Sequence, residues 1–208
     1  MDNIEKIFFA SGNEGKIREA VSILSLLSID LLTSADVPGF NSPEETGASF
    51  IENARIKARE GFQFSGIPTF AEDAGLEVEE LGNEPGIYSS RYKGNIPQAE
   101  KNLDIIQRLD AIPEAHRRAR FHSVIVFLYG DNNIPLEIVA EGLCHGIIAD
   151  KPRGSNGFGY DPIFYIPEQS CTFGEIPAQV KNLISHRKNA LEALKERIRL
   201  LTNLKKGE

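Results

Sequence analysis

The sequence predicts an α/β fold, in which a mixed sheet carries helices on its faces. Two observations predict it. Strand-like and helix-like apolar patterns alternate along the 208 residues. Residues 124–128 are five consecutive apolar side chains, as is typical of a central strand covered on both faces. The length fits a single domain, residues 1–208, which we expect to contain two lobes.

The first third of the chain is predicted to contain one strand and two helices. Residues 4–10 form the strand, residues 11–15 a turn, and the first helix begins at about Lys16. The second helix begins near Ser49, which forms a capping-box pattern with Glu52. The apolar faces are Ile17, Val21, Leu24 and Leu27 in the first helix and Ile51, Ala54, Ala58 and Phe62 in the second.

The rest of the chain continues the alternation. Residues 68–71 are predicted to form a short strand that ends at Glu72 and Asp73. Further strands are expected at residues 121–129, 138–148 and 162–166. One helix follows Pro97 and another begins at about Ser185. Their inward residues are predicted to be Ala99, Leu103, Ile106 and Leu109 in the former and Leu191, Leu194, Ile198 and Leu201 in the latter.

The charge of the chain narrows the class of ligand. The formal net charge is −7, which argues against binding to nucleic acid, because a polynucleotide partner needs a basic surface. A small phosphate ligand needs only a few converging cations or a divalent metal. The composition therefore favours free nucleotides over polynucleotides.

The compartment is indicated by what the sequence contains and lacks. We see no apolar run long enough to span a membrane and no charged-then-apolar leader, so no membrane partner is expected. The two cysteines, Cys144 and Cys171, have no metal-type spacing. We expect both to be free buried thiols of a reducing cytoplasm.

A glycine-rich loop carries the most informative pattern. Residues 152–162 place three glycines among two aromatic rings and a carboxylate that precedes a proline. Flat apolar rings on a flexible backbone suit a pocket for a nucleobase, although a tight turn with core aromatics fits the same pattern. The residues concerned are Phe158, Gly159, Tyr160 and Asp161.

A strand-to-helix turn is the candidate phosphate site. The backbone N–H groups at a helix N-terminus attract anions, and Lys16 adds a full positive charge. The pattern is not a P-loop, because Ile17 stands where a Ser or Thr would follow the lysine. An ordinary turn with a solvated lysine remains the alternative. The turn consists of Ser11, Gly12, Asn13, Glu14, Gly15 and Lys16.

Two acidic pairs are candidates for catalysis and metal binding. Glu72 and Asp73 are adjacent in an extended segment, so their side chains point in different directions. One can hold Mg²⁺ or activate water while the other turns inward. Glu44 and Glu45 offer further oxygen ligands, although a solvated acidic run is the simpler interpretation of that pair taken alone.

Two cations stand in the first turn of the predicted C-terminal helix. Ser185 is the expected N-cap, followed by His186 and Arg187. Positive charge there opposes the helix dipole, which is unfavourable for stability and suited to binding an anion or a base edge. For a purine ligand, a hydrogen bond donated by His186 or Arg187 would favour the position-6 oxygen of hypoxanthine over the amino group of adenine.

Six motifs in order resemble one known family, the inosine/xanthosine triphosphate pyrophosphatases. They are Ser11-x-Asn13-x-x-Lys16, Phe50-x-Glu52-Asn53-Ala54, Glu72-Asp73-x-Gly75-Leu76, Pro85-Gly86-Ile87-Tyr88-Ser89-Ser90-Arg91-Tyr92, Gly157-Phe158-Gly159-Tyr160-Asp161-Pro162 and Ser185-His186-Arg187. Each motif is modest alone, but the set spans nearly the whole chain. The resemblance implies an elongated sheet with two lobes around a central substrate cleft. It also implies Mg²⁺ dependence and a homodimer.

The resemblance further implies an activity and its residues. The activity is hydrolysis of ITP, dITP or XTP to the nucleoside monophosphate and pyrophosphate. Asp73 would be the general base and a metal ligand, aided by Glu44 or Glu45. The substrate would be held by residues 11–16, Ala74, residues 158–161, Lys181, His186 and Arg187. Bacterial members usually have Asp-Asp-Ser-Gly where this chain has residues 72–75; Glu72 keeps the charge, but Ala74 lacks the serine hydroxyl.

Two other functions are compatible with parts of the pattern. A Maf-like pyrophosphatase would act on other modified nucleotides, but its arginine-rich N-terminal loop is not seen at residues 11–16. A nucleotide-binding regulator without catalysis is disfavoured by the retained Asp73, Lys16 and acidic pair.

Overall fold

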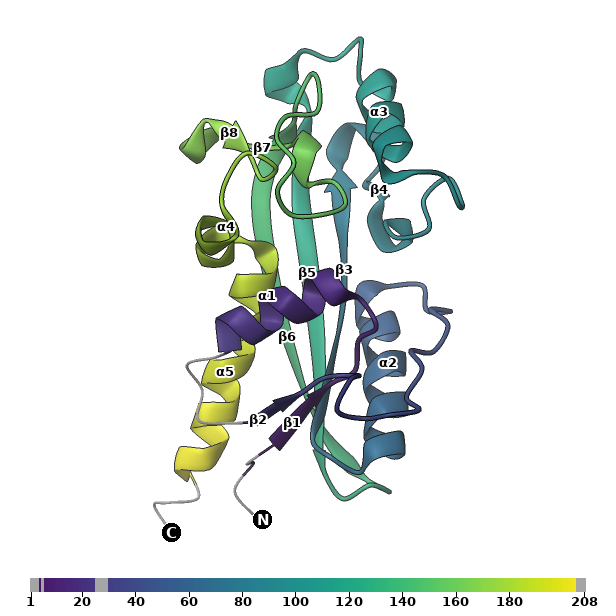
Figure 1. Ribbon diagram of the computed structural model, residues 1–208, viewed down its shortest axis with the longest axis vertical. Helices are drawn as coiled ribbons and strands as arrows, with labels where there is room; N and C mark the ends of the chain where they lie inside the picture. The colour runs from purple at the N-terminus through teal and green to yellow at the C-terminus, as the bar shows by residue number, and fades with distance from the viewer. Residues whose placement is uncertain (1–3, 5, 25–29, 205–208) are drawn as a thin grey trace. The chain divides into compact units, whose positions relative to one another are not determined.

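The computed structural model describes residue 4, residues 6–24 and residues 30–204, with side chains to residue 200 (Figure 1). Contacts divide the chain into two compact units. The first consists of residues 1–73, 123–142 and 187–208, and the second of residues 74–122 and 143–186. Leu27 and the side chain of Leu201, both expected to face inward, lie outside the described residues.

The described strands form one eight-stranded sheet with the order β2-β1-β3-β5-β6-β7-β8, and β4 pairs with β3. β1 is parallel to β2 and β3, whereas β7 is antiparallel to β6 and β8, so the predicted mixed sheet is confirmed. The strands are β1 Lys6–Phe9, β2 Asp30–Leu32, β3 Thr69–Val78, β4 Glu84–Pro85, β5 Arg118–Gly130, β6 Pro135–Ile148, β7 Phe164–Ile166 and β8 Cys171–Thr172.

In the described part of the chain, five α-helices flank the strands: α1 Glu14–Leu24, α2 Phe50–Ser65, α3 Gln98–Arg108, α4 Ala178–Ile184 and α5 His186–Leu204. Short 3₁₀ helices occupy Glu79–Leu81, Gly86–Tyr88, Glu114–His116, Asp161–Ile163 and Pro167–Gln169. Among the described residues, no helix combines the length and the apolar character that crossing a membrane requires.

In the first unit, strand alternation separates two apolar layers. Ile7 and Phe9 of β1 pack with α1 and α5, whereas Phe8 between them packs with α2. The central run of β5 divides in the same way, with Ile125 on the α5 side and Val126 on the α2 side. Figure 1 shows α2 on one side of these strands and α5 on the other. Helices therefore cover both faces of the sheet in this unit, as the apolar run predicted.

The predicted cap of α2 is confirmed. Ser49 accepts a hydrogen bond from the backbone N–H of Glu52 at 3.3 Å, as the capping box requires. The Glu52 carboxylate accepts from the N–H of Ala48 at 2.7 Å, which is one residue before the cap. The apolar face is also as predicted, since Ala54 and Ala58 are fully buried.

Two predicted helix faces need correction. Val21 of α1 is 45% exposed, and Glu19 and Ala20 are buried instead. In α3, Leu103 is 46% exposed and Ala99 is also exposed. The buried face of α3 is Lys101, Asn102, Ile105 and Ile106. The buried faces of both helices include polar residues. A prediction from apolar periodicity assumes that charged and amide groups face water, so it placed the buried face at the wrong residues.

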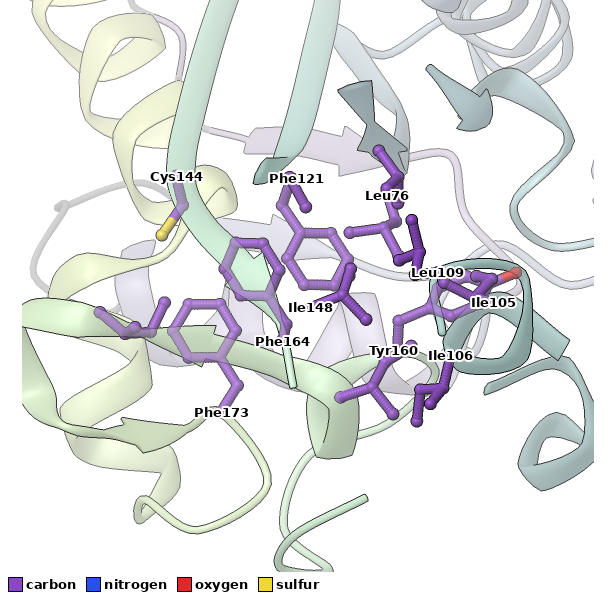
Figure 2. Packing of buried hydrophobic residues seen from close by; sticks show 14 of the residues in the cluster. Leu76, Ile105, Ile106, Leu109, Phe121, Cys144, Ile148, Tyr160, Phe164 and Phe173 are labelled. Carbon is purple, nitrogen blue, oxygen red and sulfur yellow. The ribbon is translucent and has the colours of Figure 1, made fainter. Parts of the chain in front are cut away.

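The second unit has its own aromatic core (Figure 2). Phe121, Phe164 and Phe173 pack together, with ring centroids 4.6 to 6.0 Å apart. Tyr160 and the inner face of α3 belong to the same cluster. Cys144 is also buried here, and burial raises its pKa to about 12.

β3 is longer than predicted, which moves the candidate acids. The strand does not end at Glu72 and Asp73 but continues to Val78, because Leu76 and Val78 are buried in the core of the second unit. Glu72 and Asp73 therefore lie in the middle of a ten-residue strand. The prediction assumed that two adjacent acids must face water and so end the strand. Both are buried instead, because each has a cationic partner.

Candidate active site

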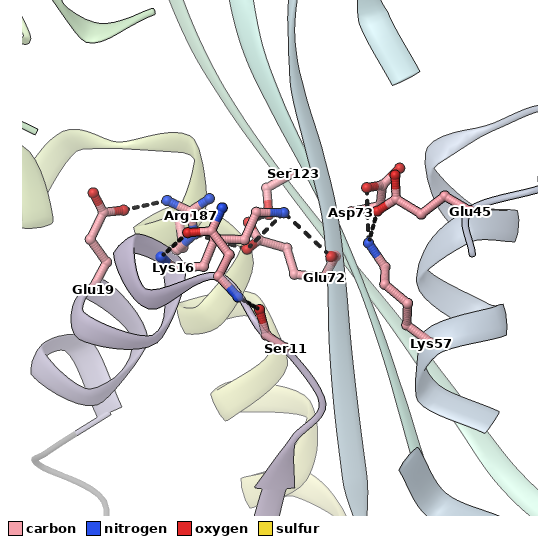
Figure 3. A network of polar contacts seen from close by, with 10 residues as sticks. Ser11, Lys16, Glu19, Glu45, Lys57, Glu72, Asp73, Ser123 and Arg187 are labelled. Carbon is pink, nitrogen blue, oxygen red and sulfur yellow. Dashed lines mark hydrogen bonds and ion pairs between the residues drawn. The ribbon is translucent and has the colours of Figure 1, made fainter. Parts of the chain in front are cut away.

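In the first unit, Glu72 and Asp73 each lie at the centre of a group of polar side chains (Figure 3). Both side chains are buried, with relative exposures of 3% and 4%. Glu72 contacts Ser123, Arg187 and Lys16, whereas Asp73 contacts Asn53 and Lys57. The two side chains thus point to different partners, as the alternation of an extended strand predicts, although the charge of Lys16 also acts on Asp73.

The Asp73 group is built on α2. Lys57 donates to one oxygen of Asp73 at 3.0 Å and to Glu45 at 2.7 Å. The side-chain amide of Asn53, one helical turn before Lys57, donates to the other Asp73 oxygen at 3.2 Å. A second carboxylate therefore shares the ammonium that neutralises Asp73.

Burial sets the protonation behaviour of Asp73. Removal from water raises the pKa of its carboxyl, and Glu45 acts in the same direction. Lys57 and then Lys16 oppose this effect, but the net direction is upward. A carboxylate with a raised pKa takes up a proton more readily than an ordinary aspartate, which suits a general base.

The Glu72 group fixes two cations. The hydroxyl of Ser123 donates to one Glu72 oxygen at 2.6 Å, and Arg187 donates to the other at 2.8 Å. Arg187 also forms an ion pair with Glu19 of α1. The ammonium of Lys16 lies 3.8 Å from the Glu72 carboxylate. Burial, the largest influence, lowers the pKa of Lys16, and the charge of Glu72 opposes this.

Arg187 lies in the first turn of α5, as predicted. It was expected to be available for an anion or a base edge, and its surroundings differ from that. It is 2% exposed and held by two carboxylates, Glu72 and Glu19. Burial lowers its pKa, and the two carboxylates raise it more, so the net direction is upward. A contact of Arg187 with phosphate or base must therefore compete with these two partners.

The strand-to-helix turn of residues 11–16 has a definite local structure. The side chain of Asn13 accepts a hydrogen bond from the backbone N–H of Lys16 at 3.1 Å and so caps α1. Ser11 is buried and accepts from the N–H of Asn13 at 3.2 Å. Glu14 is exposed and pairs with Arg18, and Gly15 is buried. Gly12 is exposed, and a side-chain atom added there would meet nothing within 4 Å.

The second unit holds the glycine-rich loop. One oxygen of Asp161 accepts from the backbone N–H of Phe158 at 2.8 Å and from Lys181 at 2.6 Å. The Lys181 ammonium also lies 4.8 Å from the ring centroid of Phe158. The side chains of Lys181 and Asp161 are almost fully buried. Gly157 has φ +73°, and an added Cβ would lie 1.9 Å from the Asp161 carboxylate. Glycine is therefore required for this loop to close on Asp161.

The other candidate residues of the second unit have different surroundings. Tyr160 is 4% exposed, lies in the aromatic core and donates its hydroxyl to the carbonyl of Ser89 at 2.8 Å. His186 is 3% exposed and stacks on Phe121, with ring centroids 4.6 Å apart. Ala74 and Gly159 are half-buried. Of the two loop aromatics, Phe158 is the more exposed.

The two metal-binding candidates of the acidic pair, Glu44 and Glu45, differ in their surroundings. Glu44 is exposed, whereas Glu45 shares the Lys57 ammonium with Asp73. No cluster of three or more His, Cys, Asp or Glu side chains is arranged for a metal ion within the described part of the chain. Two carboxylates that converge on one cation still match Mg²⁺, which commonly takes one or two carboxylates and completes its shell with phosphate oxygens and water.

Sequence reasoning missed Lys57 and Glu19 and gave no site role to Asn53, which stood in one of the motifs; the structure brings all three to these groups. A signal for Lys57 was present. It stands beside Ala58 on the buried face of α2, four residues after Asn53, where a charged side chain has no place unless it is paired. Glu19, buried beside Ala20, carries the same signal in α1.

Comparison with known proteins gives one family. The model of the Ham1 family matches residues 7–197. Curated dITP/XTP pyrophosphatases from Shigella flexneri and Haemophilus influenzae are 43% and 44% identical to the chain. These alignments cover 94% and 93% of the chain and 99% of each relative.

Solved structures agree with the sequence relatives. A HAM1 protein from Coxiella burnetii has a TM-score of 0.81 and 41% identity, over 95% of this chain and 98% of that one. The Ham1 protein of Staphylococcus aureus has a TM-score of 0.79 and 37% identity, over 93% and 98%. With the family model, the relatives and the fold in agreement, the chain belongs to the Ham1 family.

Proposed function

We propose that this chain is a nucleoside-triphosphate pyrophosphatase that hydrolyses the noncanonical purine nucleotides ITP, dITP and XTP. The products are the nucleoside monophosphate and pyrophosphate. The observation that carries the proposal is Asp73, a buried carboxylate with a raised pKa between cationic side chains. Relatives that align over nearly their whole length are named dITP/XTP pyrophosphatases, which supports the substrate class.

The reaction consumes one water per nucleotide. Asp73 accepts a proton from the water while the water oxygen attacks the α-phosphorus. The bond from that phosphorus to the α–β bridging oxygen breaks. The leaving group is pyrophosphate. The net direction of the Asp73 pKa favours proton uptake at this step. Asn53 and Lys57 each contact one Asp73 oxygen and so fix the orientation of the carboxylate.

Charge on the phosphates is balanced by fixed cations. Lys16, whose side chain is 14% exposed, follows the exposed start of α1 and is the phosphate ligand that we assign to the first unit. Glu72 contacts both Lys16 and Arg187 and so positions Lys16 and the start of α5. Preorganised cations stabilise the developing charge without reorganisation during the reaction.

The second unit supplies groups that suit the purine. Phe158 offers a half-buried ring for stacking, and its backbone is fixed by Asp161. Stacking does not select among purines, so discrimination requires a hydrogen bond to position 6 of the base. His186 is our assignment for this contact, because Arg187 is already held by two carboxylates.

We further propose that activity requires Mg²⁺ held by Asp73 and Glu45 together with substrate phosphates. The ion would neutralise phosphate charge when bound. Calorimetric titration of the protein with Mg²⁺ and a non-hydrolysable triphosphate tests the assignment. Glu45→Gln should weaken Mg²⁺ binding by roughly tenfold or more. Glu44→Gln is the matched control and should leave it unchanged; the reverse pattern would assign the metal to Glu44.

The remaining expectations concern assembly and compartment. We propose a homodimer, which sedimentation velocity at several protein concentrations tests directly. We also propose the cytoplasm as the compartment. Cys144 is buried and Cys171 is half-buried, and both are free thiols, a state compatible with a reducing compartment.

One experiment tests the function as a whole. The protein is given a panel of nucleoside triphosphates, and phosphate and pyrophosphate are counted separately. We expect pyrophosphate and monophosphate in a one-to-one ratio, with ITP, dITP and XTP preferred over ATP and GTP. Orthophosphate with a diphosphate would exclude the mechanism. Preference for modified pyrimidines would indicate a Maf-like activity, and binding of ITP without turnover would indicate a regulator.

A further inference from the structure

The glycine-rich loop of the second unit has a contact with α3 to which the proposed function gives no role. The side-chain amide of Asn102 donates to the carbonyl of Gly159 at 3.2 Å. Gly159 directly follows Phe158, the ring that we assign to stacking on the base. The two bonded residues are 57 positions apart in the chain, so a helix far away in sequence holds the loop beside its functional ring.

The orientation of the Asn102 amide is set by a second residue of α3. Gln98 stands four residues earlier, on the same face of the helix, and donates to the Asn102 side-chain oxygen at 2.9 Å. An amide that accepts through its oxygen presents its N–H groups elsewhere, and here they point to Gly159. Asn102 is 4% exposed, so water has little access to this bond.

The two glycines beside Phe158 differ in how their surroundings confine them. An added Cβ at Gly157 would lie 1.9 Å from the Asp161 carboxylate, so neighbouring atoms pack closely on that residue. At Gly159, with φ +63°, an added Cβ would meet nothing within 4 Å. Packing therefore restrains the backbone before Phe158, whereas the backbone after it depends on hydrogen bonding.

The helix that supplies this bond is firmly anchored. Ile105 and Ile106 of α3 are buried in the aromatic core of the second unit, in the same cluster as Tyr160 of the loop (Figure 2). Gln98 also contacts the hydroxyl of Tyr160. A hydrogen bond from such a helix can hold a loop residue in one place, because the donor itself has little freedom to move.

We propose that Asn102 is a positioning residue, which holds the backbone after Phe158 so that the ring is presented to the purine. In this role Asn102 contacts the loop and acts on the substrate through Phe158. The inference rests on the proposed function, in which Phe158 stacks on the base. Stacking is equally available to the bound substrate and to the transition state, so the role concerns KM and not kcat.

A double-mutant cycle tests whether Asn102 acts through Phe158. Asn102→Ala should raise KM for ITP and for XTP by the same factor, roughly fivefold, the scale of one neutral hydrogen bond, and leave kcat unchanged. In the Phe158→Ala background the same substitution should change KM by less than about twofold, because the ring that Asn102 positions is gone. A merely structural role would give equal factors in both backgrounds, and that result would overturn the proposal.

The same helix offers a control and a substitute. Gln107→Ala, on an exposed amide of α3, should change neither KM nor kcat. If Asn102→Ala does not fold, the half-buried Gln98 replaces it in the cycle, since Gln98→Ala removes the donor that orients the Asn102 amide. An unchanged KM in the folded variant, or an unchanged KM in Phe158→Ala, would show that the proposal is wrong.

Calorimetric titration with a non-hydrolysable ITP analogue and Mg²⁺ separates this inference from the proposed function. The dissociation constants complete the same cycle without turnover. A wild-type protein that binds the analogue but does not hydrolyse ITP would contradict the proposed function, and the cycle in Kd would still decide the role of Asn102. Hydrolysis of ITP with Kd and KM unaffected by Asn102→Ala would leave the function in place and overturn only the inference.

Discussion

Among the described residues, a buried aspartate–lysine pair is found in each unit, and the two pairs differ in the other contacts that they make. Lys181 and Asp161 of the second unit are 2.6 Å apart, and the same Asp161 oxygen also accepts the Phe158 N–H. Lys57 and Asp73 of the first unit are 3.0 Å apart, and Lys57 is nearer to a second carboxylate, Glu45, at 2.7 Å.

We propose that the Asp161–Lys181 pair mainly fixes its loop, whereas Asp73 takes part in the reaction. Asp161 has its charge neutralised by Lys181 and by a backbone donor, so it fixes the loop around Phe158. Asp73 must share its cation, and burial raises its pKa. A carboxylate whose partner is shared is less stabilised as an anion and is better suited to accept a proton.

The largest predicted effect is on catalysis. Asp73→Asn should lower kcat by roughly 10²–10⁴-fold, because the amide cannot take a proton from water. Retention of more than about a tenth of kcat, well short of that loss, would show that Asp73 is not the base. Glu44→Gln, on an exposed side chain, is the matched control and should keep full activity.

The Asp73→Asn variant should not lose stability at neutral pH. A carboxyl whose pKa is raised by folding stabilises the protein below its unfolded pKa and loses that contribution as pH rises through the folded value. At pH 7 ionised Asp73 therefore opposes folding, so Asp73→Asn should melt at the wild-type temperature or above. The gain should vanish in acid. A large drop in melting temperature at pH 7 would contradict this sign.

The structural pair should show the opposite behaviour. Asp161→Asn leaves Lys181 buried without its carboxylate and should destabilise the fold by about 3–5 kcal/mol. Denaturant unfolding, followed by two probes to detect separate transitions of the units, measures it. The control is Asp150→Asn, in an exposed pair with Arg153, which should leave the midpoint unchanged. Equal midpoints for both variants would remove the distinction between the pairs.

A glycine beside Asp161 sharpens the comparison. Gly157→Ala combines φ +73° with an atom 1.9 Å from the carboxylate, and should destabilise by about 1–3 kcal/mol. Gly82 has a similar φ of +66° but open space around it. Gly82→Ala thus measures backbone strain alone, and an equal loss in both variants would show that closure on Asp161 contributes nothing.

The smallest predicted effect is on the pH profile. Lys57 lowers the pKa of Asp73, so Lys57→Met should raise it further and move the acid limb of kcat/KM to higher pH. Arg55→Gln, on the same helix but paired with the more exposed Glu137, is the control. An acid limb that stays in place would mean that the limb reports a group other than Asp73.

Local features of the fold were predictable from the sequence. The cap at Ser49, the apolar face of α2 and the central strand β5 all depend on neighbours within a few residues, and each was found. The extent of β3 was not predictable, because its acids are neutralised by partners far along the chain. Arg187 lies 115 residues from Glu72, and Lys57 lies 16 residues from Asp73.

The candidate site shows the same division. Motifs pointed to Asp73, Lys16 and Phe158, but they did not show which acid faces which cation. The choice of Glu45 over Glu44 also required the position of Lys57. Pairing of buried charges is a tertiary property, and a single sequence records only that an unusual charge stands on an apolar face.

The position of Lys57 also bears on how the protein is made. Some small metal-binding domains fold only when their metal ion binds. Here an ammonium from the chain itself lies between Asp73 and Glu45. The fold around these two carboxylates is therefore complete without a divalent ion, and we expect folding yield to be independent of magnesium supply.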